Sequence, residues 1–184
     1  MPIATTSALL CFVIAVSDGD TLKARCEDPD TGRRTTQVVR LAAIDAPERA
    51  QPFGGRAHQS LSEMTLRKPA RLMCREKRDR YDRMLCTAWV TPASCTRPGC
   101  EFTLDAGLAM LTVGLAWWPP QFAREQTAQQ RGQYEFAQFE AKAKRAGLWR
   151  EGDKAVPPWE WRREHPSWPR RTHATAHRGG EMNQ

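Results

Sequence analysis

The amino-terminal half of the chain consists of short apolar runs separated by turn residues, and this spacing constrains the fold more than any other feature. Strand-type patterns occupy residues 11–16, 21–25, 36–44, 70–75 and 84–90. An Asp-Gly turn at residues 17–21 joins the first two runs and favours a β-hairpin. A charged turn at residues 77–83 joins the last two. Five short, closely spaced strands predict a small sheet that closes on itself.

Helical periodicity appears between and after these strands. Residues 55–66 place apolar side chains at i, i+4 and i+7, and the Lys-Pro pair that follows stops the helix. A second helix is expected from near Thr103, whose hydroxyl can cap it with Asp105 in the first turn, to Gly114. A third is expected over residues 127–145.

The aromatic segment at residues 156–161 is expected to be extended and to pack on the domain. Strands with helices between and after them predict an α+β protein that is mainly β barrel. The matching architecture is a five-stranded OB-fold barrel with about three helices.

The chain length fits a single domain, because 184 residues and 20.9 kDa are one domain's worth of material. We expect the barrel domain to span residues 11–162. Residues 1–10 would form a separate N-terminal segment that could be the remnant of an export signal, and residues 163–184 a basic, mobile tail. No apolar run reaches the roughly 18 to 20 residues that a membrane span needs, which excludes a transmembrane protein.

The charge balance is basic, with 28 Lys and Arg against 21 Asp and Glu and a net charge of +7. Such a surface attracts anions, nucleic acid among them. Arg is far commoner than Lys in this chain. A genome rich in G and C produces the same bias, so composition alone does not decide the partner.

The six cysteines are compatible with three local disulfide bonds. A hairpin about residues 17–21 and another about residues 79–83 would each place two cysteines nearly opposite one another, within disulfide reach. The third pair would close a small Pro-Gly loop. A zinc site at that loop lacks a second ligand pair, and buried free thiols are the remaining alternative. The candidate pairs are Cys11 with Cys26, Cys74 with Cys86, and Cys95 with Cys100.

Charged residues gather at strand ends and turns, where a barrel could bring them together. One group surrounds Asp20 in the first turn, a second runs from Arg40 through Asp45 to Glu48, and a third is the turn that ends at Arg83. Each pattern is commonplace alone. Pro47 breaks the strand, so the carboxylates around it lie on an irregular segment that can aim at one point.

In this order the motifs resemble those of the staphylococcal nuclease, or thermonuclease, family. The resemblance covers roughly residues 11–162. It rests on Asp18-Gly-Asp-Thr21, Arg40-Leu-x-x-Ile-Asp-Ala-Pro-Glu48, Asp79-Arg-Tyr-x-Arg83, Gly114-Leu-Ala-Trp117, Gly147-Leu-Trp149 and Pro157-Pro-Trp-Glu-Trp-Arg162. It implies a five-stranded OB barrel that hydrolyses DNA and RNA with calcium and leaves 3′-phosphate ends.

The resemblance also implies a role for each matching residue. Asp20 and Asp45 would bind Ca²⁺, with the Ala46 carbonyl as a third ligand. Glu48 would act on the attacking water, either as general base or by orienting it, and Arg40 and Arg83 would hold the phosphate. Hard cations prefer such oxygen ligands, and guanidinium forks suit phosphate. These preferences support the assignment independently of the resemblance.

Four further residues are candidate substrate contacts. Arg80 and Tyr81 match family positions that contact a terminal phosphate. Trp117 and Trp118 could stack on bases, with packing at the foot of a helix as the alternative. Asp82 departs from the family, which has Gly between Tyr and Arg, at a position expected to need a positive φ. His58 is expected to be a surface residue and not a ligand.

The competing hypothesis is a noncatalytic OB-fold module that binds nucleic acid or protein. The complete acidic set of Asp20, Asp45 and Glu48 favours catalysis. We expect a monomer that acts on DNA and RNA without sequence preference and does not bind membranes. Export to the periplasm or medium is favoured, because a nonspecific nuclease is hazardous in the cytoplasm.

Overall fold

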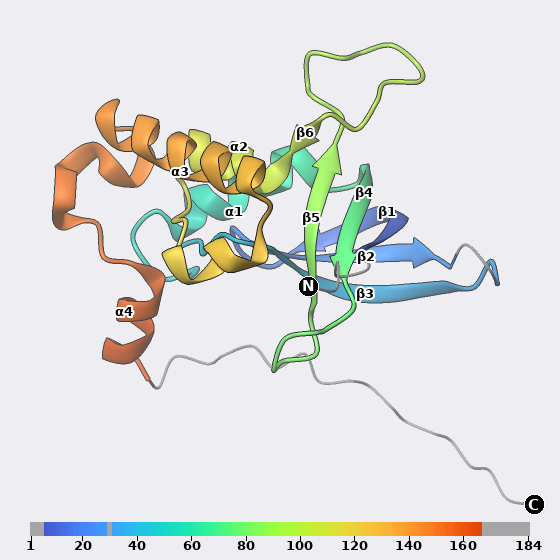
Figure 1. The fold of residues 1–184 in the computed structure, drawn as a ribbon, viewed down its shortest axis with the longest axis horizontal. Helices are drawn as coiled ribbons and strands as arrows, with labels where there is room; N and C mark the ends of the chain where they lie inside the picture. The colour runs from blue at the N-terminus through green and yellow to red at the C-terminus, as the bar shows by residue number, and fades with distance from the viewer. Residues whose placement is uncertain (1–5, 29–30, 167–184) are drawn as a thin grey trace, which may run out of the picture.

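The computed structural model describes residues 6–28 and 31–166, and its centre is a strongly curved sheet (Figure 1). The strand order is β3-β2-β1-β4-β5-β6, and β3 also pairs with β5 in parallel, which closes five strands into a barrel. The expected OB-type α+β fold is therefore confirmed. The strands are β1 (Thr6–Val16), β2 (Thr21–Glu27), β3 (Arg34–Leu41), β4 (Pro69–Arg75), β5 (Met84–Val90) and the two-residue β6 (Leu104–Asp105).

Three helices lie together beside one end of the barrel, and the last lies apart from them (Figure 1). They are α1 (Gly54–Thr65), α2 (Ala106–Thr112), α3 (Ala128–Ala143) and α4 (Pro158–Glu164), with 3₁₀ turns η1 (Pro120–Glu125) and η2 (Gly147–Lys154). The first three match the expected helices, and α4 was not expected. Among the described residues no helix is both long and apolar enough to cross a membrane.

Helix α4 corrects the expectation of an extended segment at residues 156–161. Pro158 is the first residue of this helix. A proline there loses nothing, because the first N–H groups of a helix have no partner within it, and its fixed φ suits the helix. The pair of prolines therefore marks a helix start and not an extended run.

The cap of α2 also differs from the expectation, because Asp105 and not Thr103 is the N-cap. The Asp105 carboxylate accepts from the N–H groups of Gly107 and Leu108, and it also accepts from the hydroxyl of Tyr134 at 2.8 Å. Two backbone donors and a buried phenol outweigh the local preference for Thr.

Two strand ends are displaced from their predicted positions. The first strand begins at Thr6 and pairs with β4 from there, so residues 6–10 belong to the sheet and not to a separate segment. The third strand ends at Leu41, because the chain turns through Ala43 at a φ of 62°. Of the predicted tail over residues 163–184, Arg163 and Glu164 belong to a helix, and the part from residue 167 onward lies outside the described residues.

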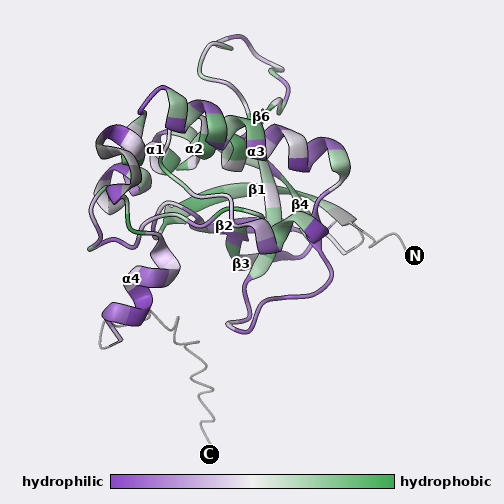
Figure 2. Cartoon of the chain, turned by 60° about the vertical axis from the view of Figure 1, so that its left-hand side comes forward, coloured by the Kyte–Doolittle hydropathy of each residue, from purple (hydrophilic) through white to green (hydrophobic). Residues whose placement is uncertain are grey.

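The core fills the barrel and the space beneath the helices. Its largest fully buried apolar side chains include Leu22, Leu41, Ile44, Leu61, Leu72, Met110 and Leu111. Figure 2 shows the corresponding hydrophobic colouring along the strands. The cysteines form the three predicted pairs, Cys11–Cys26, Cys74–Cys86 and Cys95–Cys100, and none in the described chain is free. Each of the first two disulfides joins two neighbouring strands of the barrel at directly opposite positions.

Candidate active site

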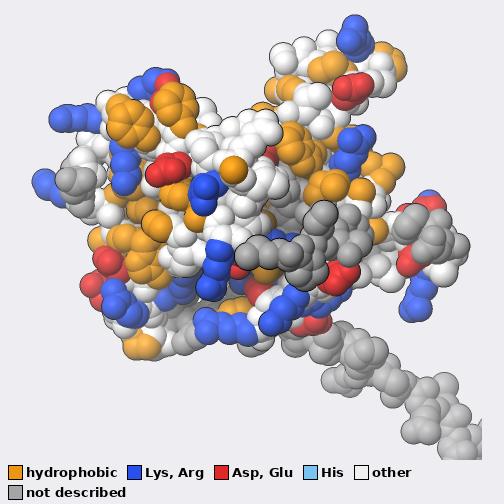
Figure 3. Space-filling view, viewed as in Figure 1, with side chains coloured by type: hydrophobic (Ala, Val, Ile, Leu, Met, Phe, Trp, Pro, Cys, Tyr) orange, Lys and Arg blue, Asp and Glu red, His pale blue; other side chains and the backbone are white. Residues whose placement is uncertain are grey.

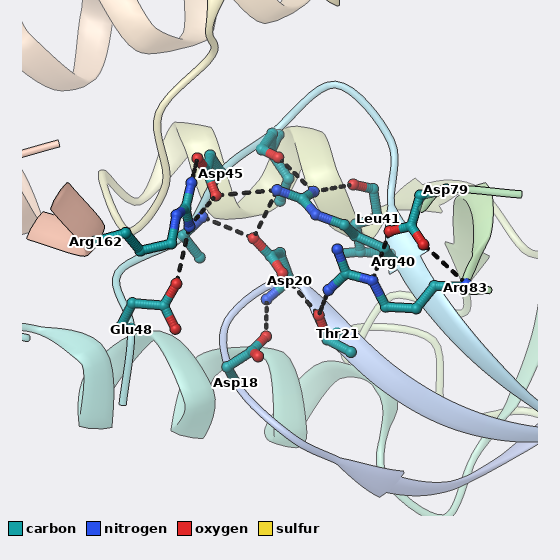
Figure 4. Close-up of polar contacts among 12 residues, drawn as sticks. Asp18, Asp20, Thr21, Arg40, Leu41, Asp45, Glu48, Asp79, Arg83 and Arg162 are labelled. Atoms are coloured by element: carbon teal, nitrogen blue, oxygen red, sulfur yellow. Dashed lines mark hydrogen bonds and ion pairs between the residues drawn. The ribbon is translucent and has the colours of Figure 1, made fainter. Parts of the chain in front are cut away.

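Two buried aspartates, from separate turns, form the centre of the site (Figure 4). Asp20 lies between β1 and β2, where its carboxylate accepts from the Ala46 N–H at 2.9 Å and from the Thr21 hydroxyl at 2.8 Å. Asp45 follows β3, and both its N–H and its carbonyl pair with the backbone of Trp117. These contacts hold both carboxylates on backbone that packing fixes in place.

Gly19 explains how the first turn comes so close to the helix layer. A Cβ at this position would lie 2.6 Å from the Cβ of Ala57 on α1 and 2.7 Å from that of Ala46. Only glycine leaves room for this approach. The Gly in the Asp-Gly-Asp motif therefore provides close packing as well as a tight turn.

The Arg40 guanidinium bridges the two aspartates. Its Nη2 lies 3.0 Å from Asp45 and 3.4 Å from Asp20, and its Nη1 donates to the carbonyls of Leu41 at 3.0 Å and Ile44 at 2.8 Å. Both terminal nitrogens are thus engaged within the protein. Arg40 organises the carboxylate pair as well as being a candidate phosphate ligand.

The electrostatics of the pair are asymmetric. Burial alone would raise the pKa of Asp20, but Arg40 and the Ala46 N–H lower it. For Asp45 burial prevails over Arg40 and Arg162, and the pKa is raised. Burial and the neighbouring Asp20 charge together raise the pKa of Asp18 to about 8. Burial is thus the main reason for the raised pKa of Asp18 and Asp45, and a cation bound between the carboxylates would favour their charged forms.

Glu48 lies at the edge of the site, on a tightly folded loop. Its carbonyl accepts from the Gln51 N–H at 2.9 Å, its own N–H donates to the Gln51 side chain at 3.1 Å, and the Gln51 amide donates to the Val156 carbonyl at 2.6 Å. A Cβ at Gly54 would lie 1.9 Å from the Glu48 carbonyl oxygen, so this loop requires glycine there. Gln51 thus connects the Glu48 loop to the segment that leads into α4.

Arg162 is a candidate site residue that the sequence interpretation did not identify. It extends from α4 and donates to Asp45 at 2.7 Å and to Glu48 at 2.8 Å, joining the two carboxylates (Figure 4). The sequence showed it only as the end of the Pro-Trp-Glu-Trp-Arg motif. Its partners lie 114 and 117 residues away in the chain, and no local pattern reveals such a contact.

Arg83 approaches the same pocket from the turn between β4 and β5. Its Nε donates to Asp79 at 2.7 Å, and its Nη1 lies 3.3 Å from the Thr21 hydroxyl. The backbone N–H groups of Tyr81 and Arg83 also donate to Asp79, so this carboxylate organises the turn.

Asp82, in the same turn, has a φ of 60°, the left-handed conformation expected at this position. In Figure 3 basic side chains gather between α4 and the strands, around a few acidic ones.

The other candidate contacts divide into two groups. Tyr81 is exposed, with the Arg80 guanidinium 4.8 Å from its ring centre and that of Arg83 5.4 Å away. Trp117 and Trp118 are only 5% and 7% exposed, which leaves no ring face for a base and favours the packing alternative. Trp117 packs edge-on against Trp149 and Trp159.

His58 is half-buried on α1, and its Nε2 lies 3.3 Å from the Val16 carbonyl. It is therefore less exposed than the expected surface residue, and its printed contact is with the end of β1.

The donor set fits a hard cation, although the described residues contain no cluster of three or more His, Cys, Asp or Glu side chains that forms a metal site by itself. Asp20 and Asp45 face the same guanidinium nitrogen of Arg40. Two carboxylates completed by backbone oxygen and water are a donor set that Ca²⁺ accepts. Ala46 contacts Asp20 through its N–H, so a ligand role for its carbonyl stays a prediction.

A small barrel with two buried aspartates, a flanking glutamate and converging arginines is the architecture of a phosphodiesterase site. The comparison with protein families is consistent with this class: residues 38–151 match the model described as staphylococcal nuclease homologue. The chain belongs to the staphylococcal nuclease family, and the resemblance recognised from its motifs is confirmed.

Relatives from several bacteria support the nuclease class of enzyme. The chain is 38% identical over 152 residues to a protein named micrococcal nuclease from Shigella flexneri, covering 82% of this chain and 79% of that one. It is 37% identical over 152 residues to Protein ParB of Escherichia coli, covering 83% and 78%. It is 33% identical over 154 residues to an uncharacterized endonuclease of Haemophilus influenzae, covering 84% and 73%.

Proposed function

We propose that this protein is a calcium-dependent endonuclease that hydrolyses DNA and RNA without sequence preference and leaves 3′-phosphate ends. The observation that carries the proposal is the convergence of Asp20 and Asp45 on Arg40, with Glu48 joined to Asp45 through Arg162. Family membership supports the endonuclease class. The ion, the products and the individual roles are proposed from the chemistry of the side chains.

Asp20 and Asp45, with the Ala46 carbonyl, would hold the ion. A bound Ca²⁺ would polarise a phosphoryl oxygen and neutralise charge there. Glu48 would accept a hydrogen bond from the attacking water and either take its proton on a carboxylate oxygen or orient it. As the water oxygen bonds to phosphorus, the bond from phosphorus to the 5′ oxygen would break; the 5′ oxygen would leave with that electron pair and take up a proton from water, so the phosphate would stay on the 3′ side.

The two predicted phosphate-binding arginines differ in which guanidinium nitrogens lack a hydrogen-bond partner among the described residues. Arg83 uses Nε on Asp79 and Nη1 on Thr21, which leaves Nη2 available for a phosphate oxygen. Arg40 can turn toward phosphate only when its carboxylates have another cation. Arg80 and Tyr81 lie on the same turn as Arg83 and would contact a terminal phosphate.

Arg162 competes with a cation for Asp45. Its guanidinium engages both carboxylate oxygens of Asp45, so an ion bound there would displace it at least in part. With a side chain that is 41% exposed, Arg162 is free to move toward the substrate phosphate. We propose that Arg162 pairs with Asp45 and Glu48 when calcium is absent. When calcium is bound, Arg162 would add positive charge near the substrate phosphate.

The three disulfides support an exported enzyme, because such bonds persist in oxidising compartments. Mass spectrometry of the native protein with and without reductant tests them. The enzyme would act as a monomer. The alternative of a noncatalytic binding module predicts binding without hydrolysis.

The deciding experiment incubates the purified protein with single- and double-stranded DNA and RNA in calcium, magnesium or chelator, and then analyses the ends. Calcium-stimulated cleavage with 3′-phosphate ends is expected. Glu48→Gln should lose activity, whereas Glu63→Gln, an exposed carboxylate on α1, should not. Cleavage that needs no metal, or that survives Glu48→Gln, would contradict the mechanism.

A further inference from the structure

The outward face of β1 carries large apolar side chains in an uncovered row. Leu10 is 62% exposed, Phe12 46% and Ile14 36%, whereas Cys11 and Val13 between them are buried in the core. Successive residues of a strand point to opposite faces. The row is therefore the outer surface of a strand whose inner surface is already packed, and burial in the core does not account for it.

Basic residues on the neighbouring strands flank this row. Arg25 of β2 is the cross-strand partner of Phe12, and Arg71 of β4 is the partner of Leu10. Lys23 of β2 is paired with Ala15, next to Ile14. No carboxylate in the described part of the chain forms an ion pair with Lys23, Arg25 or Arg71. Arg71 lies over the ring of Phe102 at 5.4 Å.

This side of β2 leads from the row to the candidate active site. Thr21, Lys23 and Arg25 alternate along β2 and so share one side of the strand, which is exposed at Arg25, half-buried at Lys23 and buried at Thr21 beside the site. Thr21 is the cross-strand partner of Arg40 and hydrogen-bonds Asp20 and Arg83. At about 3.3 Å per residue, Arg25 lies about 13 Å along the strand from Thr21. A nucleic-acid strand could cover this distance in a few nucleotides.

We propose that the outer face of β1 and β2, with Leu10, Phe12, Ile14, Lys23 and Arg25 and the adjacent Arg71, binds single-stranded nucleic acid beyond the scissile phosphate. The cations attract the backbone, and the Phe12 ring and its aliphatic neighbours receive the bases. Exposed aromatics among unpaired cations are what nonspecific single-strand binding uses. Paired bases of a duplex cannot stack on Phe12, so the face selects unpaired substrate. The inference rests on the proposed nuclease function and adds a surface outside the catalytic site that would hold its substrate.

The test measures binding of a fluorescent single strand of about 12 nucleotides, within the range of sites on such barrels, by anisotropy in chelator, where no cleavage is expected. The test variant is Phe12→Ala with Arg25→Ala. The matched control is Phe136→Ala with Arg131→Ala, which also removes an exposed aromatic and an exposed arginine, both from α3. We expect the test variant to bind at least tenfold more weakly and the control to change less than twofold. Thermal melts confirm that both fold.

Cleavage then separates this surface from the catalytic site. In calcium, the test variant should lose kcat/KM on the 12-nucleotide strand at least fivefold more than on a dinucleotide, which is too short to reach β1. A duplex of the same length should be less affected than the single strand. Equal losses on long and short substrates would overturn the proposal.

Three other outcomes are informative. Equal weakening of binding in both double variants would mean that net charge alone acts, and it would overturn the proposal. Unaltered strand binding, with loss of binding to phosphatidylserine vesicles or of a dimer in light scattering, would assign the face to another partner. If the wild-type protein binds the strand through this face but cleaves neither substrate, the nuclease proposal fails and the binding surface stands.

Discussion

Two arginines reach the same pocket, Arg40 from strand β3 in the barrel wall and Arg83 from the turn between β4 and β5. Arg40 has a side chain that is 12% exposed and fixed by two carboxylates and two carbonyls. Arg83 extends from an exposed turn and is held by Asp79 and Thr21. The sequence motifs predict the same role for Arg40 and Arg83, that of phosphate ligands.

The difference shows that two arginines in one site can contribute differently to folding stability and to catalysis. Removing Arg40 leaves two buried carboxylates without their shared cation, which is costly in any fold. Removing Arg83 leaves a single carboxylate, that of Asp79, which is 15% exposed and keeps the backbone N–H groups of Tyr81 and residue 83 as donors. Arg40 therefore couples stability to activity, whereas Arg83 acts on activity almost alone.

The largest effect is expected for Arg40→Ala. Breaking a buried ion pair costs about 3 to 5 kcal/mol, which lowers Tm by roughly 10 °C in a domain of this size, and kcat/KM should fall at least about 1000-fold. Calcium should restore part of the stability, because a cation replaces the lost charge. Thermal melts with calcium and with chelator measure this.

Arg34→Ala is the matched control on the same strand, since Arg34 forms an exposed pair with Glu27. Its Tm should change by no more than about 2 °C, as for most surface pairs. If Arg40→Ala proved no less stable than this control, the structural role of Arg40 would be wrong.

Arg83→Ala should reduce kcat/KM by about 100- to 1000-fold, as when one transition-state donor is removed, with Tm nearly unchanged. Arg83→Lys should recover little, because an ammonium does not reproduce the guanidinium fork. Steady-state kinetics and a melt on the same preparation give both numbers. A large drop in Tm would remove the contrast with Arg40.

Arg162→Ala should strengthen calcium binding while it weakens catalysis. Without Arg162, a cation meets no competitor on Asp45, so the Kd for calcium should fall about three- to tenfold, while kcat/KM should fall about tenfold. Isothermal titration with calcium alone measures the first effect without turnover. Arg163→Ala is the control, because its side chain is 75% exposed and, within the described part of the chain, pairs with Glu160 alone. Unchanged or weaker calcium binding would argue against the competition.

Asp79→Asn should loosen the turn and lower kcat/KM about fivefold, since it weakens a charge-assisted contact. Partial burial would raise the pKa of Asp79, but the N–H groups of Arg83 and Tyr81 and the Arg83 guanidinium lower it below 3.8. Because the folded pKa is lowered, the stabilising charge is present at neutral pH and is lost only as the pH falls through that lowered pKa. Kinetics between pH 6 and 9 should therefore show a constant ratio of variant to wild type. A ratio that changes across this range would contradict the assignment.

The positions of the strands and several residues of the candidate site could be predicted from sequence, because the information is local. Strand β5 begins and ends where its apolar run does, and Asp20, Asp45 and Arg83 stand in short motifs that a turn or a strand end presents. Arg162 and Gln51 could not be found in this way. Each acts through partners more than 100 residues away, and such contacts are set by how α4 packs against the loop after β3.

Trp117 is a residue that the sequence did identify as a candidate, and the structure decides between its two expected roles. Trp117 follows a helix end, where the sequence allowed either a base contact or packing at the foot of the helix. Its backbone pairs with Asp45 and its ring is buried against Trp149 and Trp159. Burial favours the packing alternative, and the pairing with the Asp45 backbone could be seen only in the three-dimensional structure.

The smallest effect is expected for Asp82→Gly, the position where the chain departs from the family motif. Asp82 already adopts the left-handed φ of 60° that glycine takes without cost. Its side chain is 87% exposed and lies 3.5 Å from Arg78, not from Arg83. The carboxylate therefore does not compete for the phosphate-binding guanidinium, and the Arg78 contact with the Asp82 carbonyl survives the substitution. Activity should stay within about twofold of wild type and should not fall, and stability should rise by no more than about 1 kcal/mol, because glycine relieves the strained φ but adds freedom to the unfolded chain. Steady-state kinetics at two salt concentrations check this, since a marked loss of activity would give Asp82 a role beyond filling the turn.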